Sequence, residues 1–456
     1  MKPFDFQEEL ISQNYQALRR DRHVVCQAST GYGKGVVIAE TTRRAILKGS
    51  VVCIVCHREE IYRQLVVNLQ KMGIFPAMIV PGNHPMPGSQ VYLGMVETIC
   101  RRMTKGLIER LKINFWQMDE IHYGSYYKLV KAIDNNFIIG YTATPKTTGK
   151  PNLKEYFGEM TQGIPISELI RIGRLVKAKT FATAHDFSKV KKKGKEFDDR
   201  ELYKEFKKPV LRDGAVLAYL EHAKGLPALC YCVNVEHSNE TTLQFRKHGI
   251  RAAHLDGNSN SETRQAIWRM YLDGELDVVC NVGIATTGTD FPHTRCIISN
   301  FATLSIVKDI QVKGRGGRCD DGKDHFVHID MGMNYWRFGE FGEEIDWKFI
   351  FNHPDTELPK KKQGKRRCDD CGGVIKISLS TCPYCGAMAT KKEIEEKMML
   401  GSTIEEIREY KLKTLPPHLR MPVSQMAYPQ LLEYSQHMHY DPRWVYIQLN
   451  ARKKKQ

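Results

Sequence analysis

Apolar runs in this 456-residue sequence are short, and none approaches the ~20 residues that a transmembrane helix requires. The N-terminus also lacks the apolar core of a signal peptide. Both absences argue against a membrane-spanning or secreted protein. We therefore expect a cytoplasmic location, which would be the host cytoplasm if a phage encodes the chain.

A disulfide framework is missing as well. The sequence has 13 cysteines, an odd number, and most are scattered through apolar runs such as Val51–Cys56. Scattered cysteines of this kind are typical of reduced, small core residues. Four cysteines near the C-terminus depart from this pattern because they form two closely spaced pairs.

Acidic residues are too few to balance the charge. Asp and Glu number 52 against 68 Lys and Arg, which leaves a net charge of +16. A positive surplus favours a polyanionic partner such as nucleic acid, although a merely soluble basic surface is an open alternative. The length is sufficient for two or three domains, each with its own core.

The most informative segment is a glycine-rich loop with a lysine, Ala28–Gly35, between the apolar run Val24–Cys26 and a helical pattern from Val36. Strand, loop and helix in this order predict a phosphate-binding loop, in which backbone N–H groups and the helix N-terminus surround a polyphosphate. Lys34 would reach the terminal phosphates. The predicted nucleotide-binding residues of this loop are Ser29, Thr30, Gly31, Tyr32, Gly33, Lys34 and Gly35.

Two features modify this prediction. Phe6 and Gln7 lie just upstream of the loop, where an aromatic ring and an amide can stack on and hydrogen-bond an adenine. Gly35 stands where such loops ordinarily carry a Ser or Thr that ligates Mg²⁺. Because Mg²⁺ keeps several waters, we expect a water ordered by Asp119 to replace that ligand and the ATPase to remain active with a raised Mg²⁺ requirement.

A pair of acids closes the apolar run Phe115–Met118. Asp119 is predicted to hold the water shell of Mg²⁺, and Glu120 to orient or deprotonate the attacking water, with His122 beside them. A later apolar run ends in Thr142 and Thr144, whose hydroxyls could relay the state of the phosphate to a neighbouring domain.

Other polar residues follow predicted strands and are candidates for nucleic-acid contacts, since ligands meet parallel sheets at the carboxyl ends of their strands. In the first half these are Arg58, Thr98 and Arg101, and in the second half His237 and Thr286. Gly288 and Asp290 follow the same strand as Thr286 and are predicted to contact the nucleotide, the carboxylate through its ribose.

The segment from Gln311 to Arg318 reads Gln-x-x-Gly-Arg-x-x-Arg. This spacing separates Arg315 and Arg318 by about one helical turn, so that both can face a phosphate held on another domain. As arginine fingers they would stabilise the charge on the transferring phosphoryl group, and Gln311 belongs to the same catalytic set.

In the order of these motifs the chain resembles the superfamily 2 helicases, from residue 1 to about residue 340. Asp119-Glu120-Ile121-His122 is similar to their DExH box, and Thr142–Pro145 is similar to their Thr-Ala-Thr-Pro motif. The resemblance implies an α/β fold with two tandem RecA-like domains that share one site for ATP and Mg²⁺. The second half lacks a phosphate loop of its own, which agrees with a single shared site.

Two Cys-x-x-Cys pairs, each followed by glycine, predict a zinc ribbon-like module. Four thiolates close the coordination shell of one Zn²⁺, so this metal would be structural. The segment around them is basic, which favours nucleic-acid contact over protein docking. The predicted zinc ligands are Cys368, Cys371, Cys382 and Cys385.

These patterns predict six segments. They are a first RecA-like domain (1–178), a linker with a basic loop (179–212), a second RecA-like domain (213–345), a basic linker (346–366), the zinc module (367–390) and a helical basic tail (391–456). The basic loop of the first linker could touch nucleic acid or be plainly solvated.

Phage and bacterial helicases with a similar C-terminal cysteine module include branch-migration and fork-remodelling enzymes. The resemblance therefore implies an ATP-dependent helicase or translocase on single-stranded, forked or branched DNA, monomeric on its substrate, with phage or host replication and recombination proteins as partners. The alternatives are a DExH RNA helicase, the motor subunit of a restriction complex, and a nucleotide-gated binding protein that does not turn over.

Overall fold

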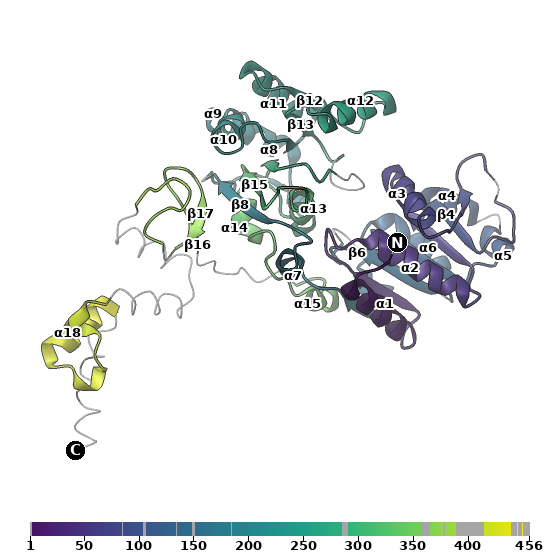
Figure 1. Ribbon diagram of the computed structural model, residues 1–456, viewed down its shortest axis with the longest axis horizontal. Coiled ribbons are helices and arrows are strands. Elements are labelled where there is room, and N and C mark those ends of the chain that lie inside the picture. The colour runs from purple at the N-terminus through teal and green to yellow at the C-terminus, as the bar shows by residue number, and fades with distance from the viewer. Residues whose placement is uncertain are drawn as a thin grey trace. The chain divides into compact units, whose positions relative to one another are not determined.

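The computed structural model describes residues 2–83, 85–103, 106–133, 135–147, 151–183, 185–284, 291–356, 365–377, 379–388 and 415–438, together with Val445 and Leu449. The chain divides into two compact units, Met1–Leu358 and Pro359–Gln456. The first unit consists of two α/β domains (Figure 1). Among the described residues, no helix combines the length and apolar character needed to cross a membrane.

The first domain is built on a seven-stranded parallel sheet with the order β3-β4-β2-β5-β6-β1-β7. Strands β2 and β5 are buried along their whole length. Continuous apolar runs are typical of parallel strands that helices cover on both faces. The strands are β1 (His23–Gln27), β2 (Val52–Cys56), β3 (Ala77–Ile79), β4 (Val91–Met95), β5 (Phe115–Asp119), β6 (Phe137–Thr142) and β7 (Glu159–Gln162).

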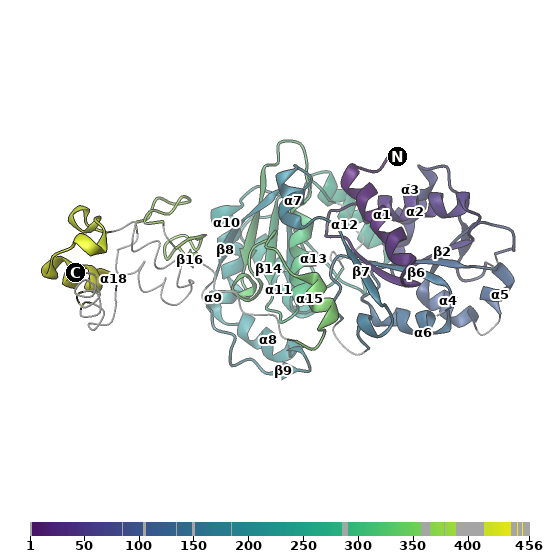
Figure 2. The same ribbon diagram turned by 90° about the horizontal axis from the view of Figure 1, so that it is seen from below.

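Helices cover both faces of this sheet: α1, α2 and α3 lie on one face and α4 and α6 on the other (Figure 2). Trp116 of β5 is fully buried among them. The helical elements are α1 (Asp5–Leu18), α2 (Lys34–Leu47), α3 (Glu59–Gln70), α4 (Val96–Met103), α5 (Leu107–Leu111), η1 (Gly124–Tyr126), α6 (Tyr127–Ala132), η2 (Leu153–Glu155) and α7 (Ile166–Arg171).

The second domain has a six-stranded parallel sheet with the order β12-β13-β11-β14-β15-β8. Its edge strand β8 begins at the end of the expected first domain (1–178) and runs into the expected linker (179–212), and the helices after it belong to the second domain. The strands are β8 (Lys177–Ala182), β11 (Ala228–Cys232), β12 (Ala252–Leu255), β13 (Val278–Asn281), β14 (Cys296–Asn300) and β15 (His325–Asp330). A short antiparallel hairpin, β9 (Lys192–Lys193) and β10 (Glu196–Phe197), follows β8.

The last helix of this unit, α15, replaces part of the second expected linker (346–366). Its Trp347 and Ile350 pack against Ile306 and Ile310 of α13, and its Phe351 joins the core of the first domain. The chain therefore returns to the first domain after completing the second. The helices of this half are α8 (Asp199–Phe206), α9 (Pro209–Arg212), α10 (Gly214–His222), α11 (Val235–Lys247), α12 (Ser261–Leu272), α13 (Ile306–Gly316), α14 (Asn334–Phe338) and α15 (Trp347–Asn352).

The second unit contains a small antiparallel sheet and a helical part. The sheet pairs β16 (Lys365–Arg367) with β17 (Val374–Lys376). The helical part comprises η3 (Pro417–Leu419), η4 (Val423–Gln425) and α18 (Tyr428–Met438). Leu415, Leu419, Met426, Leu431 and Tyr434 form its core with Val445.

Candidate functional site

The glycine-rich loop has the backbone shape of a phosphate-binding loop. Gly31 has φ +76° and Gly33 has φ +83°, a left-handed conformation that glycine adopts without steric cost. Gly33 is the N-cap of α2, so Lys34 begins that helix. The N–H of Val36 already donates to the carbonyl of Gly33 at 2.9 Å, whereas the amides at the very start of an α-helix precede its first internal hydrogen bond and can bind an anion.

Lys34 lies between the two predicted acids. Its ammonium pairs with Glu120 and lies 3.4 Å from Oδ1 of Asp119. Burial lowers the pKa of Lys34, but the two carboxylates outweigh that effect and hold the pKa above its ordinary value. Burial raises the pKa of Asp119, and Lys34 opposes part of this rise. Phosphate oxygens would compete for the same ammonium, so nucleotide binding can exchange one set of anions for another.

His122 links the acids to the second domain. Its Nδ1 lies 2.8 Å from Oγ1 of Thr142, which also accepts the N–H of Thr144 at 3.0 Å. Its Nε2 lies 3.5 Å from Nε2 of Gln311 on α13. Burial, reinforced by the charge of Lys34, lowers the pKa of His122 to about 3, so the ring is neutral. The amide of Gln311 donates to Nε2 in this arrangement, and the Nδ1 proton is then directed at Thr142.

Helix α13 packs directly on the phosphate loop. A Cβ atom built on Gly314 would lie only 2.5 Å from Oγ1 of Thr30, so the backbone of α13 lies against the side chain of Thr30, and a larger residue at position 314 would have to displace it. Arg315 follows four residues after Gln311 and therefore shares its helix face. Arg318 lies just beyond the helix, where its backbone bridges to Leu175. The charges of both guanidinium groups act on the hydroxyl of Tyr231.

The predicted adenine-binding pair is engaged with the loop itself. Nε2 of Gln7 donates to the carbonyl of Tyr32 at 2.8 Å, and its Oε1 accepts the N–H of Phe4 at 3.0 Å. The hydroxyl of Tyr32 donates to the carbonyl of Phe6, and the two rings meet edge to face. Gln7 is buried, so it sets the loop conformation, and Phe4 is the more exposed ring.

The position of Gly35 is filled by a neighbour. A Cβ atom on Gly35 would collide with the side-chain amide of Asn68, which reaches over from α3. The sequence offered no signal for this contact, because it joins two helices 33 residues apart. Ser29 completes the loop by donating to the carbonyl of Ile164 at 3.3 Å.

The residues predicted to contact nucleic acid differ in their exposure and in their partners. Arg58 is the N-cap of α3, and its guanidinium donates to the carbonyl of Gly283 in the second domain at 3.3 Å. Thr98 and Arg101 lie on the surface of α4. His237 is buried: its Nδ1 accepts the N–H of Val233 at 3.3 Å, and its Nε2 lies 3.2 Å from the side-chain amide of Asn300. Both ring nitrogens are engaged inside the domain, and we drop this contact.

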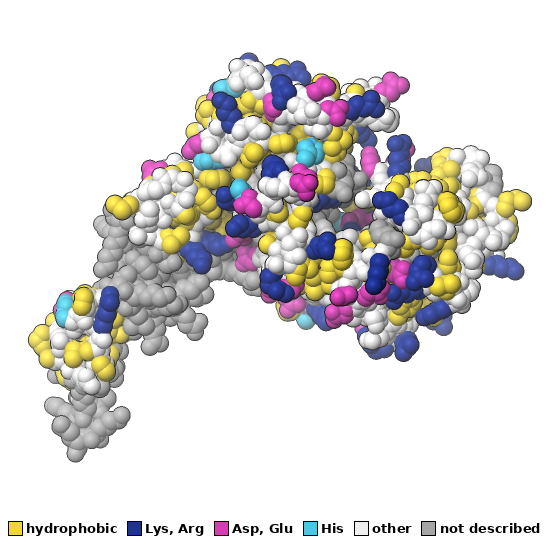
Figure 3. All heavy atoms as spheres, viewed as in Figure 1, with side chains coloured by type: hydrophobic (Ala, Val, Ile, Leu, Met, Phe, Trp, Pro, Cys, Tyr) yellow, Lys and Arg dark blue, Asp and Glu magenta, His cyan; other side chains and the backbone are white. Residues whose placement is uncertain are grey.

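Three further predicted residues, Thr286, Gly288 and Asp290, lie outside the described residues. On the face of the molecule seen in Figure 3, Lys and Arg side chains are mixed with Asp and Glu. The positive surplus of the sequence is therefore not concentrated on that face.

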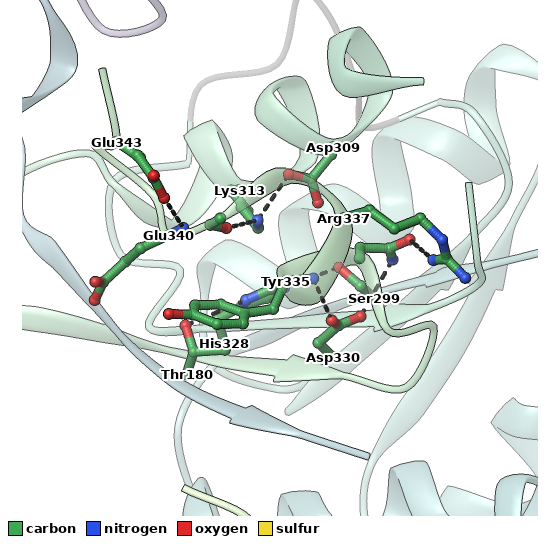
Figure 4. Close-up of polar contacts among 12 residues, drawn as sticks. Thr180, Ser299, Asp309, Lys313, His328, Asp330, Tyr335, Arg337, Glu340 and Glu343 are labelled. Carbon is green, nitrogen blue, oxygen red and sulfur yellow. Dashed lines mark hydrogen bonds and ion pairs between the residues drawn. The ribbon is translucent and has the colours of Figure 1, made fainter. Parts of the chain in front are cut away.

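A buried polar network behind α13 escaped the sequence analysis (Figure 4). Asp309 and Lys313 on this helix form an ion pair of 2.7 Å with both side chains only 2% exposed. Lys313 also donates to the carbonyl of Gly339 at 2.9 Å. Asp330 accepts the backbone N–H of Tyr335 at 2.7 Å. The i, i+4 spacing of Asp309 and Lys313 was the available signal, but spacing alone does not reveal burial.

The four cysteines of the second unit converge. The sulfur atoms of Cys368, Cys371, Cys382 and Cys385 all lie within 4.8 Å of one another. Gly372 and Gly386 each have a positive φ directly after a Cys-x-x-Cys turn. Burial raises the pKa of the Cys382 thiol, but backbone N–H groups of the turn outweigh this and lower it to about 7. This cluster has the ligand number and type of a tetrahedral zinc site.

Two protein-family models match the chain. "Type III restriction enzyme, res subunit" matches residues 1–147, and "Helicase conserved C-terminal domain" matches residues 212–320. The first lies within the first α/β domain and the second within the second α/β domain. Together they cover more than half of the chain.

Several curated proteins are similar to this chain. The chain is 28% identical to the "51.5 kDa protein" of Lactococcus phage (isolate 7-9), over 85% of this chain and 83% of the phage protein. It is 26% identical to "Putative ATP-dependent helicase IRC3" of Saccharomyces cerevisiae and 26% identical to its Schizosaccharomyces pombe counterpart, over 72% of this chain in each case. It spans only 51% and 56% of those two proteins.

Solved structures show the same fold. A fragment of a putative HsdR subunit of a type I restriction enzyme from Vibrio vulnificus YJ016 aligns with a TM-score of 0.59 and 18% identity, over 75% of this chain and 67% of that chain. Dbp5 of S. cerevisiae, bound to RNA and ADP BeF3, aligns with a TM-score of 0.51 and 15% identity, over 77% and 86%. The two parallel sheets are therefore RecA-like. With both family models in order along two RecA-like domains, the chain belongs to the ATP-dependent helicases of superfamily 2.

Proposed function

We propose that this helicase uses ATP to move along DNA and that its preferred substrates are forked or branched. The observation that carries the motor part is the packing of α13 on the phosphate loop, with Gly314 against Thr30 and Gln311 against His122. A nucleotide bound at Lys34 would touch both domains. Its γ-phosphate can therefore control how tightly the domains close, and alternate closure and opening would move the protein along a strand.

Each residue of the site has a chemical role in this proposal. Lys34 would leave the carboxylates and bind the β- and γ-phosphates. Asp119 would hold Mg²⁺ through its water shell, and that ion supplies neutralising charge to the phosphates. Glu120 would orient the attacking water, while Arg315 and Arg318 would stabilise the charge that develops on the phosphoryl group.

Neutral His122 would report the state of the phosphate. It contacts Thr142 on one side and Gln311 of the other domain on the opposite side. A change in Glu120, whose carboxylate lies 3.3 Å from Nδ1 of His122, would alter both contacts. This gives the ATP site a short path to the interface between the domains.

DNA is favoured over RNA by the named relatives. One family model is named for a restriction enzyme. The chain is also 28% identical over 109 residues to "ATP-dependent DNA helicase Q1" of Rattus norvegicus. The RNA alternative has support from "DEAD-box ATP-dependent RNA helicase 35A" of Oryza sativa, which is 25% identical over 176 residues. Arg58, Thr98, Arg101 and Thr286 are the proposed contacts in the first and second domains.

The four-cysteine cluster is proposed to bind one structural Zn²⁺. Its four thiolates leave no open position for chemistry. Lys365 and Arg367 are partly exposed on β16, just before Cys368, whereas Arg366 between them is buried and donates to the carbonyl of Leu379 at 3.0 Å. We propose that this basic module adds a grip on DNA beyond the two motor domains.

The test is steady-state ATP hydrolysis with matched single-stranded, duplex, forked and four-way DNA and with single-stranded RNA. Forked and four-way DNA should stimulate turnover most, and Lys34→Ala is the inactive control. Stronger stimulation by RNA than by any of the DNA molecules would show that RNA, and not DNA, is the substrate. Phosphate release that no nucleic acid stimulates would instead support a nucleotide-gated binding protein.

A further inference from the structure

The β9–β10 hairpin presents a cluster of lysines that the motor chemistry does not use. Its turn contains Gly194, with φ +63°. None of its lysines forms an ion pair with any residue in the described ranges. The exposed lysines of this hairpin and its approach are Lys189, Lys191, Lys192, Lys193 and Lys195.

Acidic side chains on the same stretch are directed elsewhere. Asp186 accepts the N–H of Ser188 at 2.8 Å, at the base of the hairpin. Asp198 caps helix α8 by accepting backbone N–H groups of its first turn. Glu196 turns inward and accepts the N–H of Leu304 at 2.7 Å. These acidic side chains therefore do not neutralise the lysines of the hairpin, and the resulting positive charge favours binding of a polyanion.

The hairpin is also held firmly on the second domain. Phe187 is buried before it and stacks on Phe206 of α8, with ring centroids 5.7 Å apart. Phe197, the last residue of β10, is buried, with the guanidinium of Arg337 5.2 Å from its ring centroid. Figure 2 shows β9 at the margin of the domain beside α8. Lysines on an anchored hairpin lose less backbone freedom on binding than lysines on a loose linker.

The hairpin emerges at the functional edge of the sheet. All six strands of this sheet are parallel, so their carboxyl ends share one edge. Strand β8 leads to the hairpin from that edge, β13 leads to Gly283, and β14 leads to α13. Gly283 is the residue that Arg58 contacts across the domain interface. Ligands of open parallel sheets bind at this edge.

Glu196 connects the hairpin to the arginine helix. One carboxylate oxygen accepts the hydroxyl of Thr303, and the other accepts the N–H of Leu304. The next residue, Ser305, is the N-cap of α13, and its side chain accepts the N–H of Lys308. A shift of the hairpin would therefore reach the start of the helix that carries Gln311 and Arg315.

We propose that the β9–β10 hairpin binds the phosphodiester backbone of the nucleic acid and that Glu196 transmits this binding to α13. The inference rests on the proposed function, because it needs a nucleic-acid-stimulated motor. It assigns a role to a segment that would otherwise be a solvated connection. The hairpin adds phosphate contacts on the second domain and couples them to hydrolysis.

The first experiment measures binding of fluorescent forked DNA to the full chain by anisotropy at several salt concentrations. The variant replaces Lys191, Lys192, Lys193 and Lys195 by Gln. Its affinity should fall, and the slope of log K against log salt should decrease by about 0.7–0.9 for each lost phosphate contact. The matched control uses exposed lysines of the same domain that already pair with glutamates. It replaces three lysines on and just after α8 by Gln: Lys204, Lys207 and Lys208. The control should keep the wild-type slope.

The second experiment uses Glu196→Gln, which keeps the shape and all the lysines. Affinity and salt slope should stay at wild-type values, while DNA-stimulated turnover falls several-fold. A merely structural role for Glu196 would instead lower affinity and stimulation together. Wild-type stimulation in this variant would overturn the link to α13.

The outcomes separate the inference from the proposed function. If nucleic acid fails to stimulate the wild-type chain, the proposed function is wrong. If the wild type is stimulated but the lysine variant keeps both its affinity and its slope, only the hairpin proposal is wrong. An equal loss of affinity in the hairpin variant and in the Lys204/Lys207/Lys208 control would show a general charge effect and would also refute the hairpin proposal.

Discussion

Breaking the buried ion pair of α13 should destabilise the first unit strongly. Asp309 and Lys313 lie 2.7 Å apart with side chains 2% exposed, and Lys313 also donates to the carbonyl of Gly339. Lys313→Met keeps most of the side-chain volume but leaves a carboxylate without its cation. An uncompensated buried charge of this kind costs about 3–5 kcal/mol.

The double variant separates charge from packing. Asp309→Leu with Lys313→Met removes both charges and leaves only the carbonyl of Gly339 without its donor, at about 1–3 kcal/mol. It should therefore be more stable than Lys313→Met alone. The pH dependence gives a second readout. Burial already raises the pKa of Asp309, and Lys313 opposes this rise.

In Lys313→Met the folded-state pKa of Asp309 should lie still further above its unfolded value. Protonation then favours the folded state, so the loss of stability should be largest at neutral pH and shrink as pH falls through the folded pKa. Simple loss of packing would show no such trend.

The assay is urea denaturation of the full chain followed by tryptophan fluorescence, since Trp336 and Trp347 lie near this network. Lys204→Met, which breaks the exposed pair with Glu201, is the control and should change the unfolding free energy by less than about 1 kcal/mol. A loss in Lys313→Met no larger than in this control, or a double variant less stable than the single one, would refute the reasoning.

Three other predictions concern the ATP site and the metal. Arg315→Ala should slow ATP hydrolysis by about 10³ to 10⁵ while nucleotide affinity changes less, and near wild-type phosphate release would contradict the shared site. Metal analysis should find one zinc per chain, and Cys368→Ser should lose it and expose the module to protease; full zinc content in that variant would exclude the four-thiolate site. Gly35→Ser places a Cβ on the amide of Asn68, so this substitution alone should impair ATP binding, whereas adding Asn68→Ala should restore binding and lower the Mg²⁺ requirement. Equal Mg²⁺ titrations of nucleotide binding in the double variant and the wild type would show that the hydroxyl is dispensable.

Local motifs could be predicted because their geometry depends on residues that are adjacent in the sequence. Gly31 and Gly33 adopt the positive φ that the phosphate loop needs, and the two Cys-x-x-Cys turns bring four sulfur atoms together. The fold class was implied by the resemblance that the order of these motifs carries, and the two parallel sheets confirm it. Each of these features depends on a few neighbouring side chains and on backbone conformations that glycine favours.

Segment boundaries were less predictable. Strand β8 was divided between the first domain and a linker, because its burial depends on pairing with β15, nearly 150 residues later. Helix α15 was also assigned to a linker, although Trp347 and Phe351 are buried against both motor domains. His237 was expected at the surface, and packing enclosed it. The charge and proline content of a segment do not indicate whether another part of the chain packs on it and buries it.

The sequence by itself determined the loop, the paired acids, the arginine segment and the cysteine pairs, because each is a short pattern with its own chemistry. Only the tertiary structure decided that Gly314 lies on Thr30, that Gln311 meets His122, and that Glu196 ties the lysine hairpin to α13. These contacts join residues that are more than 100 positions apart in the chain. The first two contacts form because the two sheets, each buried by its own helices, dock along one interface, and the third forms where the hairpin packs on its own domain. A sequence pattern does not specify which of these surfaces meet.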